Sequence, residues 1–220
     1  MKNNLQILLK EDQNKKFFDL LARYYDKGIV GNWLFSVIEK TINSVNIKKS
    51  SKILDVGTGT GNLFYLLEKQ NKNLNLYGID ISKRMLTIAG KKVKTAEFIK
   101  ISVLLLEKKF PRKFFDYIFV IDAFHHFPYQ KNVMSNFYNI LKINGRLVIT
   151  ELDFGFIFNY FFHMIEPGNE WLYTKKELKN LFLETGFLIE KQKKIGTFAV
   201  MTVGVKYKNS KLIKNKHFRR

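Results

Sequence analysis

The chain has 220 residues, which suits one domain with a buried core, and its 46% hydrophobic residues argue against a disordered chain. It contains no cysteine, which excludes disulfides, thiolate metal sites, iron–sulfur clusters and a cysteine nucleophile. The formal charge of +19 suits a polyanionic partner, although lysines on an ordinary solvated surface would give the same excess.

The amino terminus lacks the pattern of a signal peptide, since Glu11 and Asp12 follow a short polar start. The longest apolar stretch, residues 154–165, includes Asn159 and His163. It is shorter than the roughly 20 apolar residues that a membrane-spanning helix needs. We therefore expect a cytoplasmic protein with no transmembrane segment.

Two helices are predicted before the first strand. Residues 13–45 carry apolar side chains at helical spacing, with a break at Gly28 and Gly31. A polar connector, Lys48-Lys49-Ser50-Ser51, follows them. Residues 1–47 are therefore expected to form a helical cap on the same domain as the rest of the chain.

Short apolar strands then alternate with amphipathic helices. The expected strands are residues 53–56, 74–79, 97–101, 117–121 and 146–150. The expected helices are residues 62–70, 83–92 and 130–141, the second capped by Ser82 and the third stopped by Asn144-Gly145. This alternation predicts a parallel sheet with helices on both faces.

The last third of the chain has a different pattern. Thr174-Lys175-Lys176-Glu177 is a capping box that opens a helix ending before Gly186. Two strand patterns, residues 187–190 and 198–207, predict an antiparallel pair at the sheet edge.

The expected fold over residues 48–207 is thus a doubly wound α/β domain with a mostly parallel, seven-stranded sheet, an antiparallel last strand and helices at its amino terminus. Residues 208–220 carry basic residues and no acidic one, and are expected to form a basic tail.

The first strand runs into the glycine-rich turn 57–61. Such a turn brings backbone N–H groups and the positive end of a helix close to a ligand. A dinucleotide motif needs a glycine where this chain has Asn62, so the spacing disfavours NAD. Asp55 would repel a pyrophosphate but attract the ammonium and sulfonium groups of S-adenosylmethionine.

Four stretches resemble motifs of class I S-adenosylmethionine-dependent methyltransferases, which have a Rossmann-like fold: residues 54–61 (LDVGTGTG), 77–82 (YGIDIS), 115–128 (FDYIFVIDAFHHFP) and 141–149 (LKINGRLVI). The third stretch is most similar to the small-molecule branch that includes quinone-biosynthesis enzymes. The resemblance covers about residues 50–207. It implies S-adenosylmethionine as the cofactor, with Asp80 accepting hydrogen bonds from both ribose hydroxyls.

The resemblance also implies a set of cofactor contacts: Tyr25, Asp55, Gly57, Thr58, Gly59, Gly61, Asp80, Ile81, Met85, Ser102 and Asp122. One departure stands out. Where this branch has an acidic residue after the third strand to bind the adenine amino group, the chain reads KISVLLLE over residues 100–107. Ser102 or a backbone N–H and C=O pair would have to replace it. Reduced cofactor affinity is expected, and a non-catalytic binding module is an alternative.

Three residues are candidate bases. His125 and His126 follow the fourth expected strand and Glu151 follows the fifth, so all should lie near the mouth of the site. The competing interpretation is that one histidine caps backbone groups, the other packs against a helix, and Glu151 caps a helix or is solvated. The four histidines show no metal-ligand spacing, so no metal site is expected.

The leading hypothesis is C- or O-methylation of a small, apolar or aromatic acceptor, bound by the aromatic segment 154–164. An RNA methyltransferase is the alternative, suggested by the charge and the tail, although no Asn-Pro-Pro-Tyr-like motif follows the fourth strand. An anionic membrane surface is another partner that suits the charge, and no DNA-binding motif is recognised.

Overall fold

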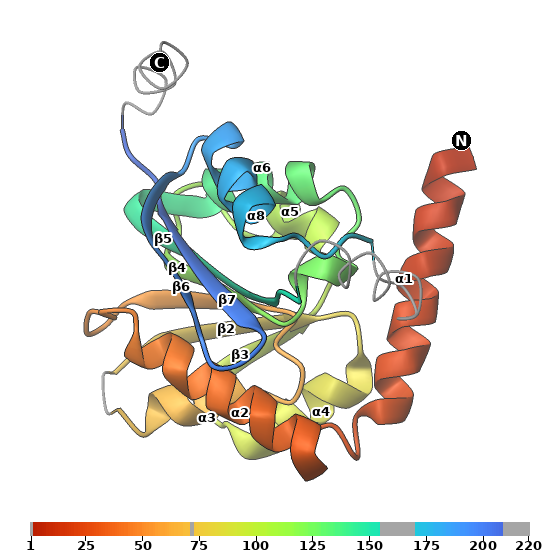
Figure 1. The fold of residues 1–220 in the computed structure, drawn as a ribbon. Helices are drawn as coiled ribbons and strands as arrows, with labels where there is room; N and C mark the ends of the chain where they lie inside the picture. Colours follow the sequence, from red (N-terminus) through yellow and green to blue (C-terminus); the bar gives the residue numbers. More distant parts are fainter. Residues whose placement is uncertain (1, 71–72, 155–169, 209–220) are drawn as a thin grey trace.

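The computed structural model describes residues 2–70, 73–154 and 170–208, which form a seven-stranded sheet between two layers of helices (Figure 1). The strands are β1 (Lys52–Val56), β2 (Asn75–Asp80), β3 (Ala96–Lys100), β4 (Phe115–Ile121), β5 (Leu141–Leu152), β6 (Leu188–Lys194) and β7 (Ala199–Val205). Their order is β3-β2-β1-β4-β5-β7-β6. Strands β1 to β5 pair in parallel, and β7 is antiparallel to both β5 and β6. The predicted mostly parallel sheet with an antiparallel last strand is confirmed.

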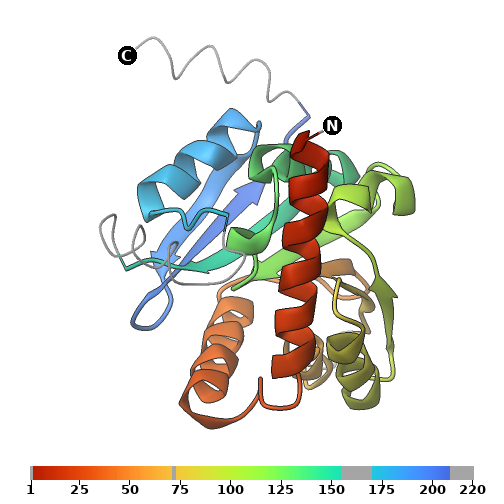
Figure 2. The ribbon, with the colours of Figure 1, turned by 90° about the vertical axis from the view of Figure 1, so that its right-hand side faces the viewer.

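Helices cover both faces of this sheet, as predicted. One face carries α2 (Gly28–Asn43), α3 (Asn62–Glu68) and α4 (Lys83–Lys92), and the other carries α5 (Leu106–Lys109), α6 (Gln130–Ile140) and α8 (Lys175–Glu184) (Figure 1). Two short 3-10 turns, η1 (Val103–Leu105) and η2 (Phe124–His126), follow β3 and β4. Helix α1 (Lys2–Leu21) belongs to neither layer and lies alongside the sheet (Figures 1 and 2).

Alternate side chains of the central strand β4 enter two different hydrophobic cores. Ile118 and Val120 pack in the cluster that includes α6 and α8. Tyr117, Phe119 and Ile121 pack in the cluster that includes α2 and α3. A strand buried on both faces reads as one continuous apolar run, which explains why residues 117–121 were recognisable in the sequence.

Helix α1 begins at Lys2, eleven residues before the predicted start at residue 13. Apolar and polar side chains are poorly segregated over the 20 residues of this helix, so periodicity gave only a weak signal for its first half. Contacts distant in sequence hold the helix in place. The carboxylate of Asp19, for example, accepts a hydrogen bond of 2.6 Å from the Ser82 hydroxyl.

Strand β5 also starts earlier than predicted, at Leu141 rather than at residue 146. The Asn144-Gly145 pair does not stop a helix, because α6 has already ended at Ile140. Asn144 instead adopts a positive φ of 64° within the strand, where the pairing register with β4 shifts. Strand β6 runs on to Lys194, beyond the predicted end at residue 190. The capping box of α8 is present as predicted.

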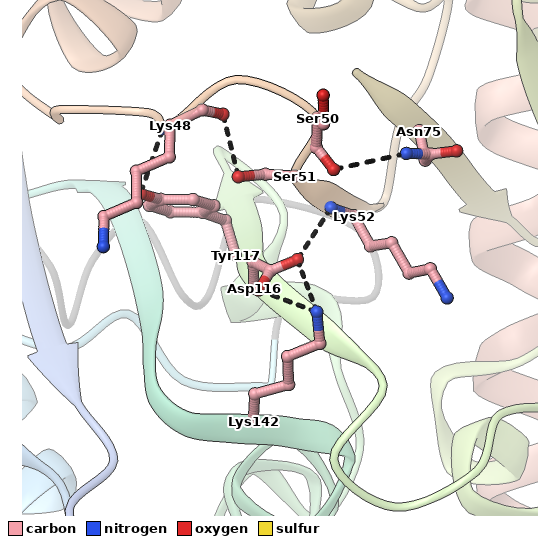
Figure 3. Close-up of polar contacts among 8 residues, drawn as sticks. All are labelled: Lys48, Ser50, Ser51, Lys52, Asn75, Asp116, Tyr117 and Lys142. Atoms are coloured by element: carbon pink, nitrogen blue, oxygen red, sulfur yellow. Dashed lines mark hydrogen bonds and ion pairs between the residues drawn. The ribbon is translucent and has the colours of Figure 1, made fainter. Parts of the chain in front are cut away.

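Polar contacts close the edge of the sheet at which β1 and β4 begin (Figure 3). The Asp116 carboxylate accepts hydrogen bonds from the Lys52 backbone N–H at 2.9 Å and from the Lys142 ammonium at 2.8 Å. The Tyr117 hydroxyl donates to the Asn46 carbonyl at 2.8 Å. These bonds join β1, β4 and β5 at one end. Within the described ranges, no helix is long and apolar enough to cross a membrane.

Candidate functional site

The glycine-rich turn after β1 is held tightly against the end of β2. The backbone N–H groups of Gly57 and Thr58 donate to the Ile79 carbonyl at 3.0 Å, and that of Gly59 donates to the Asp80 carboxylate at 2.9 Å. These three amides are therefore occupied within the protein and do not face a ligand. Gly57 has a φ of 74°, and a Cβ there would lie 2.6 Å from the Cβ of Ala123. Glycine is needed at this position because the backbone passes close to Ala123.

A cavity lies at the carboxyl ends of β1, β2 and β4. Eight predicted site residues line it: Tyr25, Gly57, Gly59, Asp80, Ile81, Met85, Asp122 and His126. A second, smaller cavity adjoins it at the glycine turn and is lined by the predicted residues Asp55 and Thr58. Ten of the fourteen predicted side chains or glycines thus surround one continuous region.

Two carboxylates in this region have raised pKa values. Burial raises the pKa of Asp55 to about 7, although a hydrogen bond of 2.7 Å from the Thr58 hydroxyl favours its ionised form. Burial also raises the pKa of Asp80 to about 6, against hydrogen bonds from the backbone N–H groups of Ser82 and Gly59. A cationic ligand would stabilise both ionised carboxylates.

Tyr25 is placed over the glycine turn by its neighbour Asp26. The Asp26 carboxylate accepts hydrogen bonds from the Thr60 hydroxyl at 2.7 Å and the Asn62 amide at 2.8 Å. It also pairs with the Lys92 ammonium at 2.8 Å. The segment between α1 and α2 is therefore tied to the start of α3, so Tyr25 can line both cavities.

Helix α1 contributes three residues to the main cavity that the sequence did not reveal: Glu11, Asn14 and Phe18. Their spacing of three and four residues places them on one face of the helix. Phe18 packs edge-on against the ring of His126, with 5.1 Å between the ring centroids. The spacing of these three residues indicates that they share a helix face, but it does not indicate which part of the fold this face contacts.

Four predicted site residues do not line either cavity. Gly61 precedes α3 with a φ of 79°, and a Cβ there would lie 3.0 Å from the Cβ of Ala89. Ser102 donates to the Glu11 carboxylate at 2.5 Å and accepts from the Leu104 N–H. The other two, His125 and Glu151, are buried behind the cavity wall.

Glu151 organises the turn that follows β4. Its Oε1 accepts hydrogen bonds from the backbone N–H groups of Ala123 at 3.0 Å and Phe124 at 2.6 Å, and its Oε2 lies 2.5 Å from the Nδ1 of His125. The same turn contains Asp122, which has a φ of 52° and lines the cavity. Positive φ is uncommon outside glycine, so the bonds of Glu151 stabilise a strained turn.

Asp122, His125 and Glu151 place one ligand atom each within 4.8 Å of one another, an arrangement that could hold a metal ion. The sequence spacing had suggested no such cluster. Both oxygens of Glu151 already accept hydrogen bonds from the protein. Hydrogen bonding therefore accounts for the placement of Glu151 and His125.

The sequence model of a family described as "Methyltransferase domain" matches residues 47–201. A demethylmenaquinone methyltransferase of Thermotoga maritima is 37% identical over 141 residues, covering 64% of this chain and 59% of the relative. One from Geobacillus is 25% identical over 236 residues, covering 90% of this chain and 98% of the relative. The crystal structure of an S-adenosylmethionine-dependent methyltransferase from Aquifex aeolicus has a TM-score of 0.68 at 20% identity, covering 84% of this chain and 97% of that one, which shows the shared fold.

Proposed function

Since the chain belongs to the methyltransferase-domain family, we propose that it transfers a methyl group from S-adenosylmethionine to carbon or oxygen of a small, apolar acceptor. The observation that carries this proposal is the pair of carboxyl groups, Asp55 and Asp80, that line the two cavities beside the glycine turn and accept hydrogen bonds from a hydroxyl and from backbone N–H groups. Their charge suits a ligand that carries an ammonium and a sulfonium group.

The predicted cofactor residues fit such a ligand. Asp80, at the end of β2, would accept hydrogen bonds from the two ribose hydroxyls. Ile81 and Met85 line the same cavity and would contact the apolar faces of the base. Asp55 lies on the other side of the glycine turn, in the adjoining cavity, and would face the ammonium group.

Methyl transfer makes few demands on catalytic side chains. When bound, the cofactor supplies an electrophilic methyl group, and alignment of the acceptor with it accounts for much of the acceleration. His126 lines the cavity, so it is the proposed base for an acceptor that must lose a proton. His125 and Glu151, which bond to each other away from the cavity, are proposed to position the turn that carries His126.

A quinone-type ring is the proposed acceptor. Both relatives described above are named as demethylmenaquinone methyltransferases. The main cavity also offers apolar and aromatic wall residues, including Phe18, Val103 and Phe127. In the aromatic segment predicted to bind the acceptor, only Phe154 is described, and its ring packs against Phe198. Residues 155–169 lie outside the described residues.

The proposal can be tested with the purified chain, methyl-labelled S-adenosylmethionine and a short-chain demethylated quinol. We expect a labelled product with a mass one methylene higher. The His126→Gln variant should bind the cofactor like the unaltered chain but turn over at least about 100-fold more slowly, the usual contribution of a general base. Label found only in RNA would contradict the small-molecule acceptor.

Two alternatives remain as proposals with less support. The basic tail that suggested RNA lies almost wholly in residues 209–220, outside the described residues, so only the overall charge favours that acceptor. A non-catalytic module is favoured only by the missing acidic residue after β3. Calorimetry tests the second alternative, because a chain that binds no S-adenosylmethionine cannot be an enzyme that uses it, whereas the acceptor that receives the label tests the first.

For a partner beyond the acceptor, we propose an anionic lipid surface. Apolar side chains are exposed where α1 ends and α2 begins: Leu20 (72%), Tyr24 (63%), Ile29 (89%) and Val30 (73%). Exposed Arg23 and Lys27 lie in the same segment, which suits attraction to acidic headgroups. Tyr25, between them, lines the cofactor cavity, so docking there would bring the site close to a lipophilic acceptor.

Sedimentation with vesicles tests this docking. The unaltered chain should bind vesicles with phosphatidylserine more tightly than vesicles of phosphatidylcholine alone. An Ile29→Ser, Val30→Ser variant should bind at least about ten-fold more weakly, because it removes two exposed apolar side chains that the lipid surface would bury. Leu9→Ser, on the other half of α1, is the matched control. Unchanged binding by the double variant would contradict the proposal.

A further inference from the structure

Glu11 of helix α1 lies where the adenine end of the cofactor would be placed. The proposed ribose contact, Asp80, is on β2, and the proposed ammonium contact, Asp55, is on β1. The base must therefore extend from the ribose toward β3, the next strand in the sheet. Glu11 reaches this end of the cavity from α1, since it lines the cavity and bonds to Ser102, just after β3.

A single short hydrogen bond orients the Glu11 side chain. The Ser102 hydroxyl donates to its Oε1 at 2.5 Å, and the Leu104 backbone N–H donates to that hydroxyl at 3.2 Å. Within the described part of the chain, no hydrogen-bond donor contacts the other oxygen, Oε2. The carboxylate is thus fixed at one oxygen and can accept a further hydrogen bond at the other.

Apolar side chains surround this carboxylate on the cavity side. Ile81, Ile101 and Val103 line the cavity together with Glu11. An apolar wall with one charged acceptor suits a flat base that presents an amino group. It disfavours a base that presents a carbonyl oxygen, because two acceptors would then face each other.

We propose that Glu11 binds the 6-amino group of the adenine, replacing the acidic residue that is missing after β3, and that Ser102 holds it in position. This inference rests on the proposed function. It assigns to the amino-terminal helix a part in choosing the base of the cofactor. The missing acidic residue then ceases to argue for a weakened site.

The test compares two nucleosides by calorimetry: S-adenosylhomocysteine, and S-inosylhomocysteine, in which an oxo group replaces the amino group. The unaltered chain should bind the adenine compound at least about ten-fold more tightly, since a hydrogen bond to a charged group has a net worth of this order. Glu11→Gln should lose most of this preference, because its amide can also donate to the oxo group.

Two variants separate recognition from a merely structural role. Asp12→Asn removes the neighbouring charge, which pairs with Lys16 outside the main cavity, and should leave the preference unchanged. Ser102→Ala keeps the Glu11 carboxylate but removes the hydroxyl that orients it. The preference for the adenine compound should therefore fall only in part. Glu11→Asp serves as a second test if Glu11→Gln does not fold, and it too should reduce the preference.

The outcomes are distinct. An unchanged ratio of the two dissociation constants in Glu11→Gln or in Glu11→Asp overturns the role of Glu11, even if the adenine compound binds well. Equal weakening of both nucleosides also overturns it, because it indicates that Glu11 only anchors the helix. If neither compound binds the unaltered chain, the proposed function itself fails together with this inference.

Discussion

The two ends of the central strands use the same residue type in opposite ways. Where the strands begin, the Asp116 carboxylate is paired with the Lys142 ammonium and the Lys52 N–H (Figure 3). Where they end, desolvation raises the pKa values of Asp55, which is buried, and of Asp80, which is half-buried. The carboxylate at the first end is already paired with a cation of the protein. The carboxyl groups at the other end would be stabilised in their ionised forms by a cationic ligand.

A shortage of cationic residues does not explain the difference between the two ends of the sheet. The chain has 38 lysine and arginine residues, yet none of those in the described ranges hydrogen-bonds or ion-pairs with Asp55 or Asp80. Their hydrogen-bond donors are neutral: the Thr58 hydroxyl and backbone N–H groups. The carboxyl end of this sheet therefore holds two carboxyl groups whose ionised forms a cationic ligand would stabilise.

Glu151 is an exception among the carboxylates at the cavity end of the sheet, because its hydrogen bonds stabilise the fold. Glu151→Ala would leave the buried N–H groups of Ala123 and Phe124 without their acceptor. The expected loss in the free energy of unfolding is about 3 kcal/mol, measurable by urea unfolding. Glu190→Ala, which removes a partly exposed ion pair, should cost less than about 1 kcal/mol. Equal losses would show that Glu151 does not organise the turn.

Asp80 should show the opposite behaviour. Asp80→Ala removes the proposed acceptor of two ribose hydroxyls, so the dissociation constant of S-adenosylhomocysteine should rise by about 100-fold. Calorimetry measures it, with Asp116→Asn as the matched control from the other end of the sheet. A less than three-fold change in Asp80→Ala would remove Asp80 from the proposed cofactor site.

The pH dependence of cofactor affinity tests whether the ionised Asp55 carboxylate binds the cofactor. Asp55 has a pKa of about 7 without ligand, and a cation would bind best to its ionised form. Affinity for S-adenosylmethionine should therefore rise about ten-fold between pH 6 and pH 8 and level off above pH 7. Asp55→Asn should bind more weakly at pH 8 and lack this rise. A rise of equal size in the variant would assign the titration to another group.

The same shift predicts the reverse trend for stability. The pKa of Asp55 is raised in the folded state, so between about pH 4 and pH 7 the folded chain holds a proton that the unfolded chain has lost. The free energy of unfolding of the ligand-free protein should therefore fall as the pH rises through this window. Thermal unfolding of Asp55→Asn at pH 8 should show a more stable protein than the unaltered chain.

Features coded by a short stretch of sequence could be predicted. The strand, glycine turn and helix around Asp55, and the placement of Asp80 at the end of the next strand, follow from local patterns and from the rule that parallel strands end at one edge. The capping box at Thr174 is equally local. These patterns were sufficient for the fold, and most of the residues predicted to bind the cofactor line the two adjoining cavities.

Features that depend on distant contacts could not be predicted. Glu11 meets Ser102 across 91 residues, and His125 meets Glu151 across 26, so no local pattern signals either pair. The Asn144-Gly145 pair misled for a different reason. Its residues favour a turn, but the Asn144 N–H donates to the Lys206 carbonyl at 2.7 Å and the Gly145 carbonyl accepts from the Lys206 N–H at 3.0 Å, which keeps the pair in line with the strand.

The smallest expected effect comes from the end of the sheet at which the strands begin. Asp116→Asn keeps an oxygen for the Lys52 N–H but loses the charge that pairs with Lys142. Both side chains of that pair are partly exposed, so the free energy of unfolding should fall by only about 1 kcal/mol. Because the pair lies at the opposite end of the strands from the cavity, the dissociation constant of S-adenosylhomocysteine should stay within two-fold. A large loss of affinity with little loss of stability would mean that the two ends of the sheet are coupled, and the division of labour between them would have to be abandoned.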